Sequence, residues 1–283
     1  MSNPAGGEFT LVIAGTAVSV RCDVAALAAR LAERYARHLD ARVALLQIEI
    51  RWTGYLRQDS RLDVGLELAG GCARFTAAGY QGQIDLSSGQ AWLELSARQP
   101  VEEVDYFLRV CYALLVFEQG GLLLHAAGIQ RAGRSYLFFG HSGAGKTTIA
   151  RLSAQLPQTS ILNDDLVIVM PGETGYLVYA TPFWNPTQVP PDIHQQPQAG
   201  LPLTGLYRLV QASQVHLEAL EAGKGLAELI SNVPVIPADP QRNPALLERL
   251  GQLNAQVPVK ALHFLPDASF WQFIHPEPVL RSP

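Results

Sequence analysis

The stretch FFGHSGAGKTTIA, residues 138–150, decides the fold of this chain. It contains the pattern G-x-x-x-x-G-K-[ST] of a phosphate-binding loop. The pattern is filled by Gly140, Gly145, Lys146 and Thr147. Apolar residues 136–139 predict a strand that enters the loop, and residues 148–152 predict a helix that leaves it. The required order of strand, loop and helix is therefore present.

Such a loop binds phosphate because its glycines let successive backbone N–H groups point inward and because a helix N-terminus is partially positive. We expect the phosphates of the bound ligand to contact Gly140, His141, Ser142, Gly143, Ala144, Gly145, Lys146, Thr147 and Thr148. The ammonium of Lys146 would reach the outer phosphates, and the hydroxyl of Thr147 would bind Mg²⁺. The alternative is a glycine-rich turn that caps a helix and binds nothing. Lysine scarcity opposes it, because the chain has 21 basic residues but lysine only at 146, 224 and 260.

Length and composition predict two globular domains. With 283 residues, 48% of them hydrophobic, we place an N-terminal domain at 1–118 and a nucleotide-binding domain at 119–283. A net charge of -4 and a pI near 6.0 argue against nucleic acid and membrane surfaces as partners. The three cysteines form no C-x-x-C pair, which favours a reduced, cytoplasmic protein without a zinc site.

The first domain is expected to be an antiparallel β-meander with helices. Asp23 is expected to cap a helix that ends near Leu39. Alternating apolar residues then predict strands around residues 46–52, 62–68, 84–86 and 93–95. A second helix is predicted over 101–117. Trp52 and Trp92 are expected to pack in the core or at the domain junction rather than to form a platform for a ligand.

The second domain is expected to be α/β, with a hairpin rather than a helical crossover leading to the loop. Two strands joined at residues 131–134 predict that hairpin. Asp164 and Asp165 lie together in an apolar stretch 18 residues after Lys146, where Mg²⁺ and a lysine would be suitable partners. Residues 185–202 are rich in proline and glutamine and predict an irregular surface loop, which could close over a reactive phosphoryl group.

This combination of loop, upstream His125 and downstream acid pair resembles the HPr kinase/phosphorylase C-terminal domain, whose nucleotide core is shared by ATP-dependent phosphoenolpyruvate carboxykinases. The resemblance spans roughly residues 121–182. It implies an α/β P-loop core and transfer of a phosphoryl group from Mg-ATP to an alcohol, typically a serine hydroxyl. The family's glycine- and asparagine-containing signature segment is not found here, so HPr is not the expected acceptor.

The chemistry assigns roles to these residues. A carboxylate must take the acceptor's proton, and we assign Asp164 as this base and Asp165 as a magnesium ligand, with the roles open to exchange. Both acids could instead be metal ligands in a hydrolase or a nucleotide sensor. The resemblance implies that His125 orients the terminal phosphate, whereas a histidine on an apolar strand is otherwise a core residue. Arg208 is a weaker candidate for a second cation, and Phe183 or Trp184 could border a ligand.

The expected function is therefore an ATP-dependent kinase that acts on a hydroxyl of a protein, peptide or small molecule. The alternatives are a nucleotide-binding accessory or scaffold protein with little turnover, and a simple phosphohydrolase. The first domain is expected to recognise the acceptor or a partner. The identity of the acceptor, the choice of ATP, ADP or pyrophosphate as donor, the reverse reaction and the formation of a homo-oligomer are left open.

Overall fold

The computed structural model describes residues 6–54, 64–96, 99–183 and 199–274. The chain forms two compact units, one of Met1–Gln119 with Ala238–Arg242 and the other of Gly120–Pro237 with Asn243–Pro283. Each unit has one β-sheet and packed helices within the described ranges, so the fold is mixed α/β.

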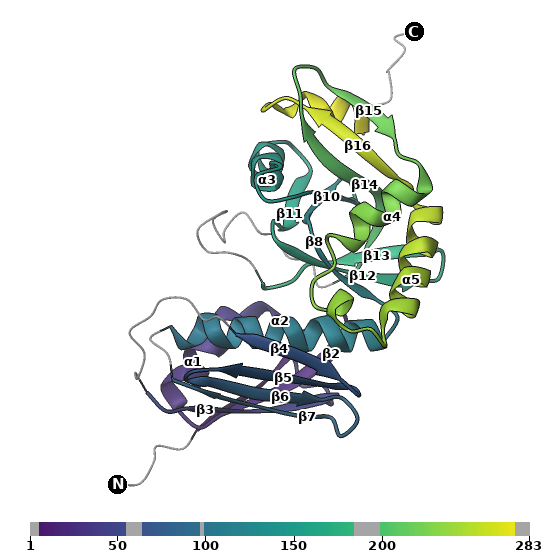
Figure 1. Ribbon diagram of the computed structural model, residues 1–283. Coiled ribbons are helices and arrows are strands. Elements are labelled where there is room, and N and C mark those ends of the chain that lie inside the picture. Colours follow the sequence, from purple (N-terminus) through teal and green to yellow (C-terminus); the bar gives the residue numbers. More distant parts are fainter. Residues whose placement is uncertain (1–5, 55–63, 97–98, 184–198, 275–283) are drawn as a thin grey trace. The chain divides into compact units, whose positions relative to one another are not determined.

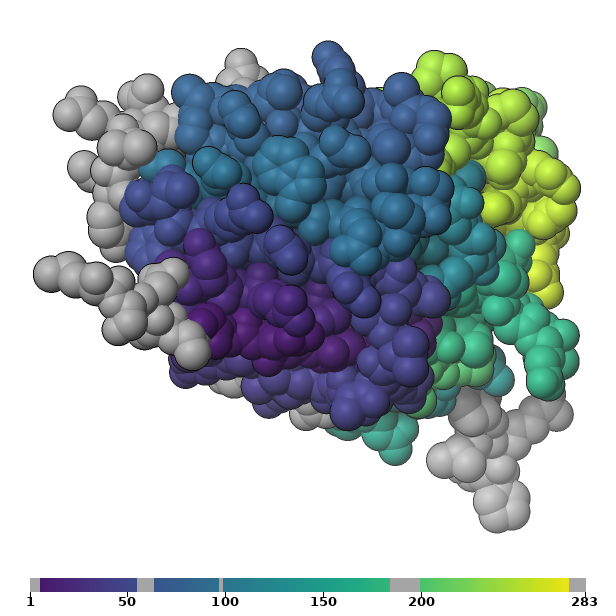
Figure 2. Space-filling model, turned by 90° about the horizontal axis from the view of Figure 1, so that it is seen from below, coloured from purple at the N-terminus to yellow at the C-terminus, as the bar shows by residue number. Residues whose placement is uncertain are grey.

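The first unit is a seven-stranded sheet covered on one face by two helices (Figure 1). Its spatial order is β1-β2-β3-β7-β6-β5-β4. The strands are β1 Gly7–Ile13, β2 Thr16–Cys22, β3 Leu46–Trp52, β4 Gly65–Ala69, β5 Cys72–Ala77, β6 Tyr80–Asp85 and β7 Gln90–Leu95. The helices are α1 Ala25–Arg34 and α2 Pro100–Glu118, with a short 3-10 helix, η1, at Ala36–His38. In the space-filling view, the purple N-terminal strands and the blue strands after them form one continuous surface (Figure 2).

Strands β4 to β7 form an antiparallel meander, in which alternation predicts β4, β6 and β7 but not β5, and β3 does not belong to it. β3 runs parallel to both β2 and β7. The alternating pattern could not reveal this, because it reports which face a residue occupies and not the direction of the neighbouring strand.

Two further predictions for the first unit are wrong. Asp23 does not cap α1, because its Oδ1 accepts a hydrogen bond from the backbone N–H of Trp52 at 3.0 Å. The helix therefore has no side-chain cap and ends at Arg34 rather than near Leu39. Trp92 is 44% exposed and lies on the outward face of β7, so it does not pack in the interior.

The second unit is built on a nine-stranded sheet. Its strands are β8 Leu122–His125, β9 Ala127–Arg131, β10 Arg134–Phe139, β11 Thr159–Asn163, β12 Leu166–Gly172, β13 Gly175–Tyr179, β14 Leu201–Gln211, β15 His216–Ala219 and β16 Val259–Phe264. Its helices are α3 Lys146–Ala154, α4 Ala222–Ile230, α5 Asn243–Gln256 and α6 Trp271–Ile274. Short 3-10 helices, η3 Ile236–Ala238 and η4 Ala268–Phe270, complete the described elements.

Strand β10, which leads to the glycine-rich loop, has an antiparallel neighbour on one edge and a parallel neighbour on the other. It forms the predicted antiparallel hairpin with β9 and also runs parallel to β14 on its other edge. The apolar stretch before the hairpin is interrupted at Ala126. Strand β8 therefore joins β12, and β9 joins β10 and β11.

Helices α3 and α4 lie on opposite sides of the central strands β10 and β14 (Figure 1). Phe138 and Tyr207 stack with ring centroids 5.4 Å apart in a buried cluster that includes Ile149 of α3 and Trp271 of α6. Arg208, the next residue after Tyr207, points to the other face and pairs with Glu228 of α4. The glycine-rich loop thus leaves a strand that is packed on both faces.

Candidate functional site

The glycine-rich loop joins β10 to α3 and depends on glycine at three positions. Gly140, Gly143 and Gly145 have φ angles of 151°, 81° and 111°, which side chains rarely allow. A Cβ at Gly145 would also lie 2.6 Å from the Phe264 ring. The loop's shape is therefore fixed by its glycines.

Lys146 is the first residue of α3, and its side chain folds back over the loop. Its Nζ donates a hydrogen bond to the carbonyl oxygen of Gly140 at 2.9 Å. Burial lowers the pKa of Lys146, while the negative charge of Asp165 partly opposes that shift. The ammonium thus lies against the loop and within electrostatic range of Asp165.

Other residues of the predicted nucleotide contact face solvent or brace the loop. Thr147 is half-buried, whereas His141, Ser142, Gly143 and Thr148 are exposed and Ala144 is buried. The Nδ1 atom of His141 lies 2.7 Å from the carbonyl oxygen of Ser142. Gln211, at the end of β14, donates from Nε2 to the carbonyl oxygen of Gly143 at 2.9 Å. Gln211 could not be selected from the sequence, because only the parallel pairing of β14 with β10 brings it beside the loop.

The acid pair forms the short connection between β11 and β12, and Asn163 holds it in place. The Oδ1 atom of Asn163 accepts hydrogen bonds from the backbone N–H groups of Asp165, at 2.7 Å, and Leu166, at 2.9 Å. Its Nδ2 atom donates to the backbone oxygen and the Oγ1 atom of Thr181. Sequence reasoning missed Asn163, although an asparagine just before a turn is a signal for this kind of hydrogen bonding.

The two acids differ in environment. Asp164 is 1% exposed, and its burial, with the negative charge of Asp165, raises its pKa to about 6, while Arg151 partly offsets the shift. The Asp165 side chain is 18% exposed, and its Oδ1 atom lies 3.1 Å from Nε2 of His125. Asp165 is therefore the accessible member of the pair, and Asp164 is the one with the altered proton affinity.

His125 ends strand β8 beside the acid pair. Its backbone N–H donates to the carbonyl oxygen of Asn232 at 2.7 Å, and its side chain is 44% exposed. His125 is thus not a core histidine. Its ring contacts Asp165, so it belongs to the same cluster as the acid pair.

Arg208 lies beside the start of the loop, since its Cα pairs with that of Phe139. Its Nε atom is 2.9 Å from Oε1 of Glu228, another residue that sequence reasoning missed. Phe183 is completely buried, so it packs and does not border a ligand. Trp184 and most of the predicted loop 185–202 lie outside the described residues, and Leu201 and Pro202 belong to β14 instead.

Within the described residues, no group of three or more histidine, cysteine, aspartate or glutamate side chains could hold a metal ion. The predicted pair of Thr147 and Asp165 offers only two ligands. This number suits Mg²⁺ held mainly by phosphate oxygens and water, and it does not suit a metal held by protein alone.

The chain belongs to the family described as SynChlorMet cassette protein ScmC, whose model matches residues 102–275, more than half of the chain. The resemblance to HPr kinase/phosphorylase is therefore wrong as a family assignment. The motifs behind it span about a fifth of the chain, roughly residues 121–182. No curated protein matches the chain. None of the described helices is long and apolar enough to cross a membrane.

Proposed function

We propose that this protein binds Mg-ATP through a P-loop core at residues 140–148 and transfers a phosphoryl group to a hydroxyl of a peptide, protein or small molecule. The observation that carries the proposal is the contact between Asp165 and His125, within electrostatic range of Lys146 on the glycine-rich loop. Asp165 lies 3.1 Å from His125, and its charge acts on Lys146, which folds over the glycine-rich loop. Cationic and acidic groups beside such a loop are what phosphoryl transfer requires.

The residues present fit the nucleotide. Glycines with positive φ at 140, 143 and 145 let the loop amides face phosphate oxygens, and the N-terminus of α3 adds partial positive charge. Lys146 and Thr147 would hold the outer phosphates and Mg²⁺, together with Asp165. When bound, Mg-ATP supplies the phosphoryl group and the metal that neutralises its charge.

The chain's own residues would handle the proton. With a pKa near 6, the Asp164 carboxylate is ionised at neutral pH yet basic enough to accept the proton of an acceptor hydroxyl. His125 would keep Asp165 oriented through the 3.1 Å contact. The family description as a cassette protein favours an acceptor that is made or carried by proteins encoded nearby.

A second candidate is an accessory protein that binds nucleotide with little turnover. The burial of Asp164 favours it, because a base has to reach its substrate. In such an accessory protein, Asp164 would stabilise the site without taking a proton.

Single substitutions separate these functions. Asp164→Asn should keep Mg-ATP affinity within a few-fold, while phosphoryl transfer falls by about 100-fold or more. Asp165→Asn should raise the magnesium concentration needed for half-maximal binding. Glu94→Gln, on the exposed face of the first unit, is the control. If both wild type and Asp164→Asn bind nucleotide and turn it over at the same low rate, the accessory function is supported. If the wild type binds no nucleotide, both functions are rejected.

A further inference from the structure

Besides the glycine-rich loop, the nine-stranded unit has a fork in its sheet, a point at which two strands pair with the same edge of β14. One edge of β14 pairs with β10, and the other edge is shared by two strands. On that shared edge, β13 pairs with Leu201 and Pro202, and β16 pairs with residues 206–211. Leu203, Thr204 and Gly205 belong to neither of these two ladders. The strands on either side diverge there and leave a gap.

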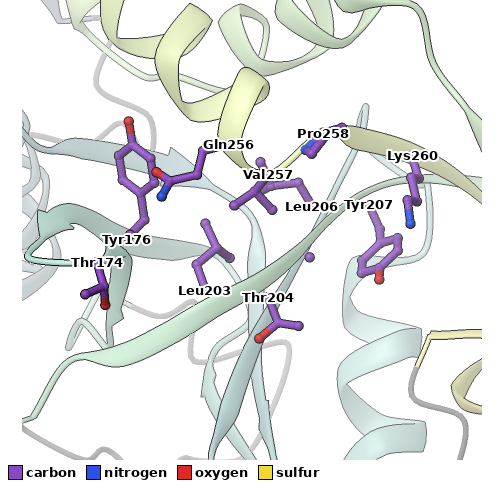
Figure 3. Close-up of a pocket in the computed structure, with 12 residues that line it drawn as sticks. Thr174, Tyr176, Leu203, Thr204, Leu206, Tyr207, Gln256, Val257, Pro258 and Lys260 are labelled. Carbon is purple, nitrogen blue, oxygen red and sulfur yellow. The ribbon is translucent and has the colours of Figure 1, made fainter.

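The gap is a pocket of about 370 Å³ (Figure 3). This volume lies in the range of sites for small molecules, about 300–1,000 Å³. Leu203 and Leu206 of β14 line it with Val257 and Pro258, which connect α5 to β16. Gln256, at the end of α5, lies over the same space in Figure 3. The pocket therefore combines an apolar wall with polar groups.

The lining of the pocket carries one positive charge, on Lys260. Lys260 is the one charged side chain of its lining, and the described part of the chain offers Lys260 no ion-pair partner. Lys260 is directly opposite Tyr207 in the ladder of β14 and β16. The Tyr207 ring lies across Gly205, where a Cβ would be 2.6 Å from the tyrosine hydroxyl. Burial raises the pKa of Tyr207 to about 12, so its hydroxyl keeps its proton and can donate it in a hydrogen bond.

The pocket is separate from the glycine-rich loop. Both lie along β14, but the loop follows β10, which pairs with one edge of β14, whereas the pocket lies on the other edge, between β13 and β16. Gly140, at the start of the loop, lies beside the backbone of Leu209, two residues after Tyr207 of the pocket lining, or about 7 Å of strand at roughly 3.3 Å per residue. A nucleotide on the loop would therefore leave the pocket accessible.

We propose that this pocket is a second binding site, which takes a small, partly apolar molecule with one carboxylate. The carboxylate would pair with Lys260 and accept a hydrogen bond from Tyr207, while the apolar part of the molecule would lie against Leu203, Leu206 and Val257 (Figure 3). One ammonium matches one carboxylate, whereas phosphate esters are usually held by several donors or an arginine fork. The proposal stands independently of the proposed kinase activity.

The test uses the full chain and a pair of probes that differ only in charge, N-acetylphenylalanine and its uncharged amide. Calorimetry or ligand-observed NMR should show binding of the acid about tenfold tighter than that of the amide. Lys260→Gln should abolish this preference, and Lys224→Gln, which alters the other lysine outside the loop, should keep it. Gln256→Trp changes an exposed side chain at the pocket and should weaken both probes.

Saturating Mg-ATP should leave the affinity for the acid unchanged. The proposal is overturned by an absence of binding at about 10 mM acid, by equal affinity for acid and amide, or by an acid preference that survives Lys260→Gln. Displacement of the acid by Mg-ATP would overturn it too, since the acid would then occupy the loop. A loss of kinase activity in Asp164→Asn bears on the proposed function only.

Discussion

The side-chain amide of Asn163 donates hydrogen bonds to Thr181, 18 residues later in the chain, and this contact supports the turn that carries the acid pair. Nδ2 of Asn163 is 2.9 Å from the backbone oxygen of Thr181 and 3.2 Å from its Oγ1 atom, and both residues are fully buried. The Thr181 hydroxyl also donates to the carbonyl oxygen of Leu166 at 2.6 Å. The turn that carries Asp164 and Asp165 is therefore fixed at both of its ends.

Asn163→Ala should lower the free energy of unfolding by about 1–3 kcal/mol, because it leaves buried N–H and C=O groups without their partner. Denaturation in urea measures this loss. Thr181→Val keeps the volume and removes only the hydroxyl, so it should cost less and should leave the Asp165 N–H bonded. An Asn163→Ala protein as stable as wild type would mean that the turn does not need this amide.

Lys146→Ala should weaken Mg-ATP binding by about 2–4 kcal/mol, or roughly 30- to 1000-fold, as expected for loss of a cation that contacts phosphate. Calorimetry measures the affinity, and Lys224→Ala serves as the matched control because Lys224 lies on α4. Equal affinity of the wild type and Lys146→Ala would remove the phosphate-binding interpretation of the loop.

Gly145→Ala should destabilise the protein more than Gly143→Ala does. Both positions have positive φ, which costs an L-residue about 1–2 kcal/mol. Only at Gly145 does the new Cβ also meet a neighbour, the Phe264 ring at 2.6 Å, whereas the space around Gly143 is open. Thermal unfolding of the two variants isolates the cost of the contact. Equal losses would show that Phe264 moves aside freely.

The sequence predicted the parts of the site that depend on local pattern. The loop, the hairpin before it and the helix after it follow from glycine spacing and apolar periodicity, and the structure has β9, β10 and α3 there. The second helix lies at Pro100–Glu118, within one residue of its predicted ends. Such features are encoded within a few residues of one another.

Features that depend on distant pairing could not be predicted in this way. Gln211 braces the loop because β14 runs parallel to β10, and Thr181 reaches Asn163 across a strand pair. The fork beside Leu203 exists only because β13 and β16 share one edge of β14. The prediction that Asp23 caps α1 was wrong for the same reason, because its carboxylate accepts a hydrogen bond from the backbone N–H of Trp52, which lies in β3.

The pH dependence of stability tests the environment of Asp164. Its pKa is about 6 in the folded protein and about 3.8 in a model peptide, so the folded state binds the extra proton between these values. Its contribution to stability is therefore full below about pH 4 and is lost as the pH rises through 6, by about 3 kcal/mol. Asp164→Asn removes the ionisation, so the variant should gain stability relative to wild type as the pH rises from 4 to 8.

Urea denaturation at several pH values, without nucleotide or Mg²⁺, measures this difference. Asp267→Asn is a control of opposite sign, because hydrogen bonds from Ser269 lower the pKa of Asp267. That carboxylate stabilises the fold above its unfolded pKa, so its replacement should cost stability at neutral pH and cost less in acid. If Asp164→Asn shows the same stability difference from wild type at pH 4 and pH 8, Asp164 has an ordinary pKa. It would then lack the raised proton affinity on which its proposed role as base depends.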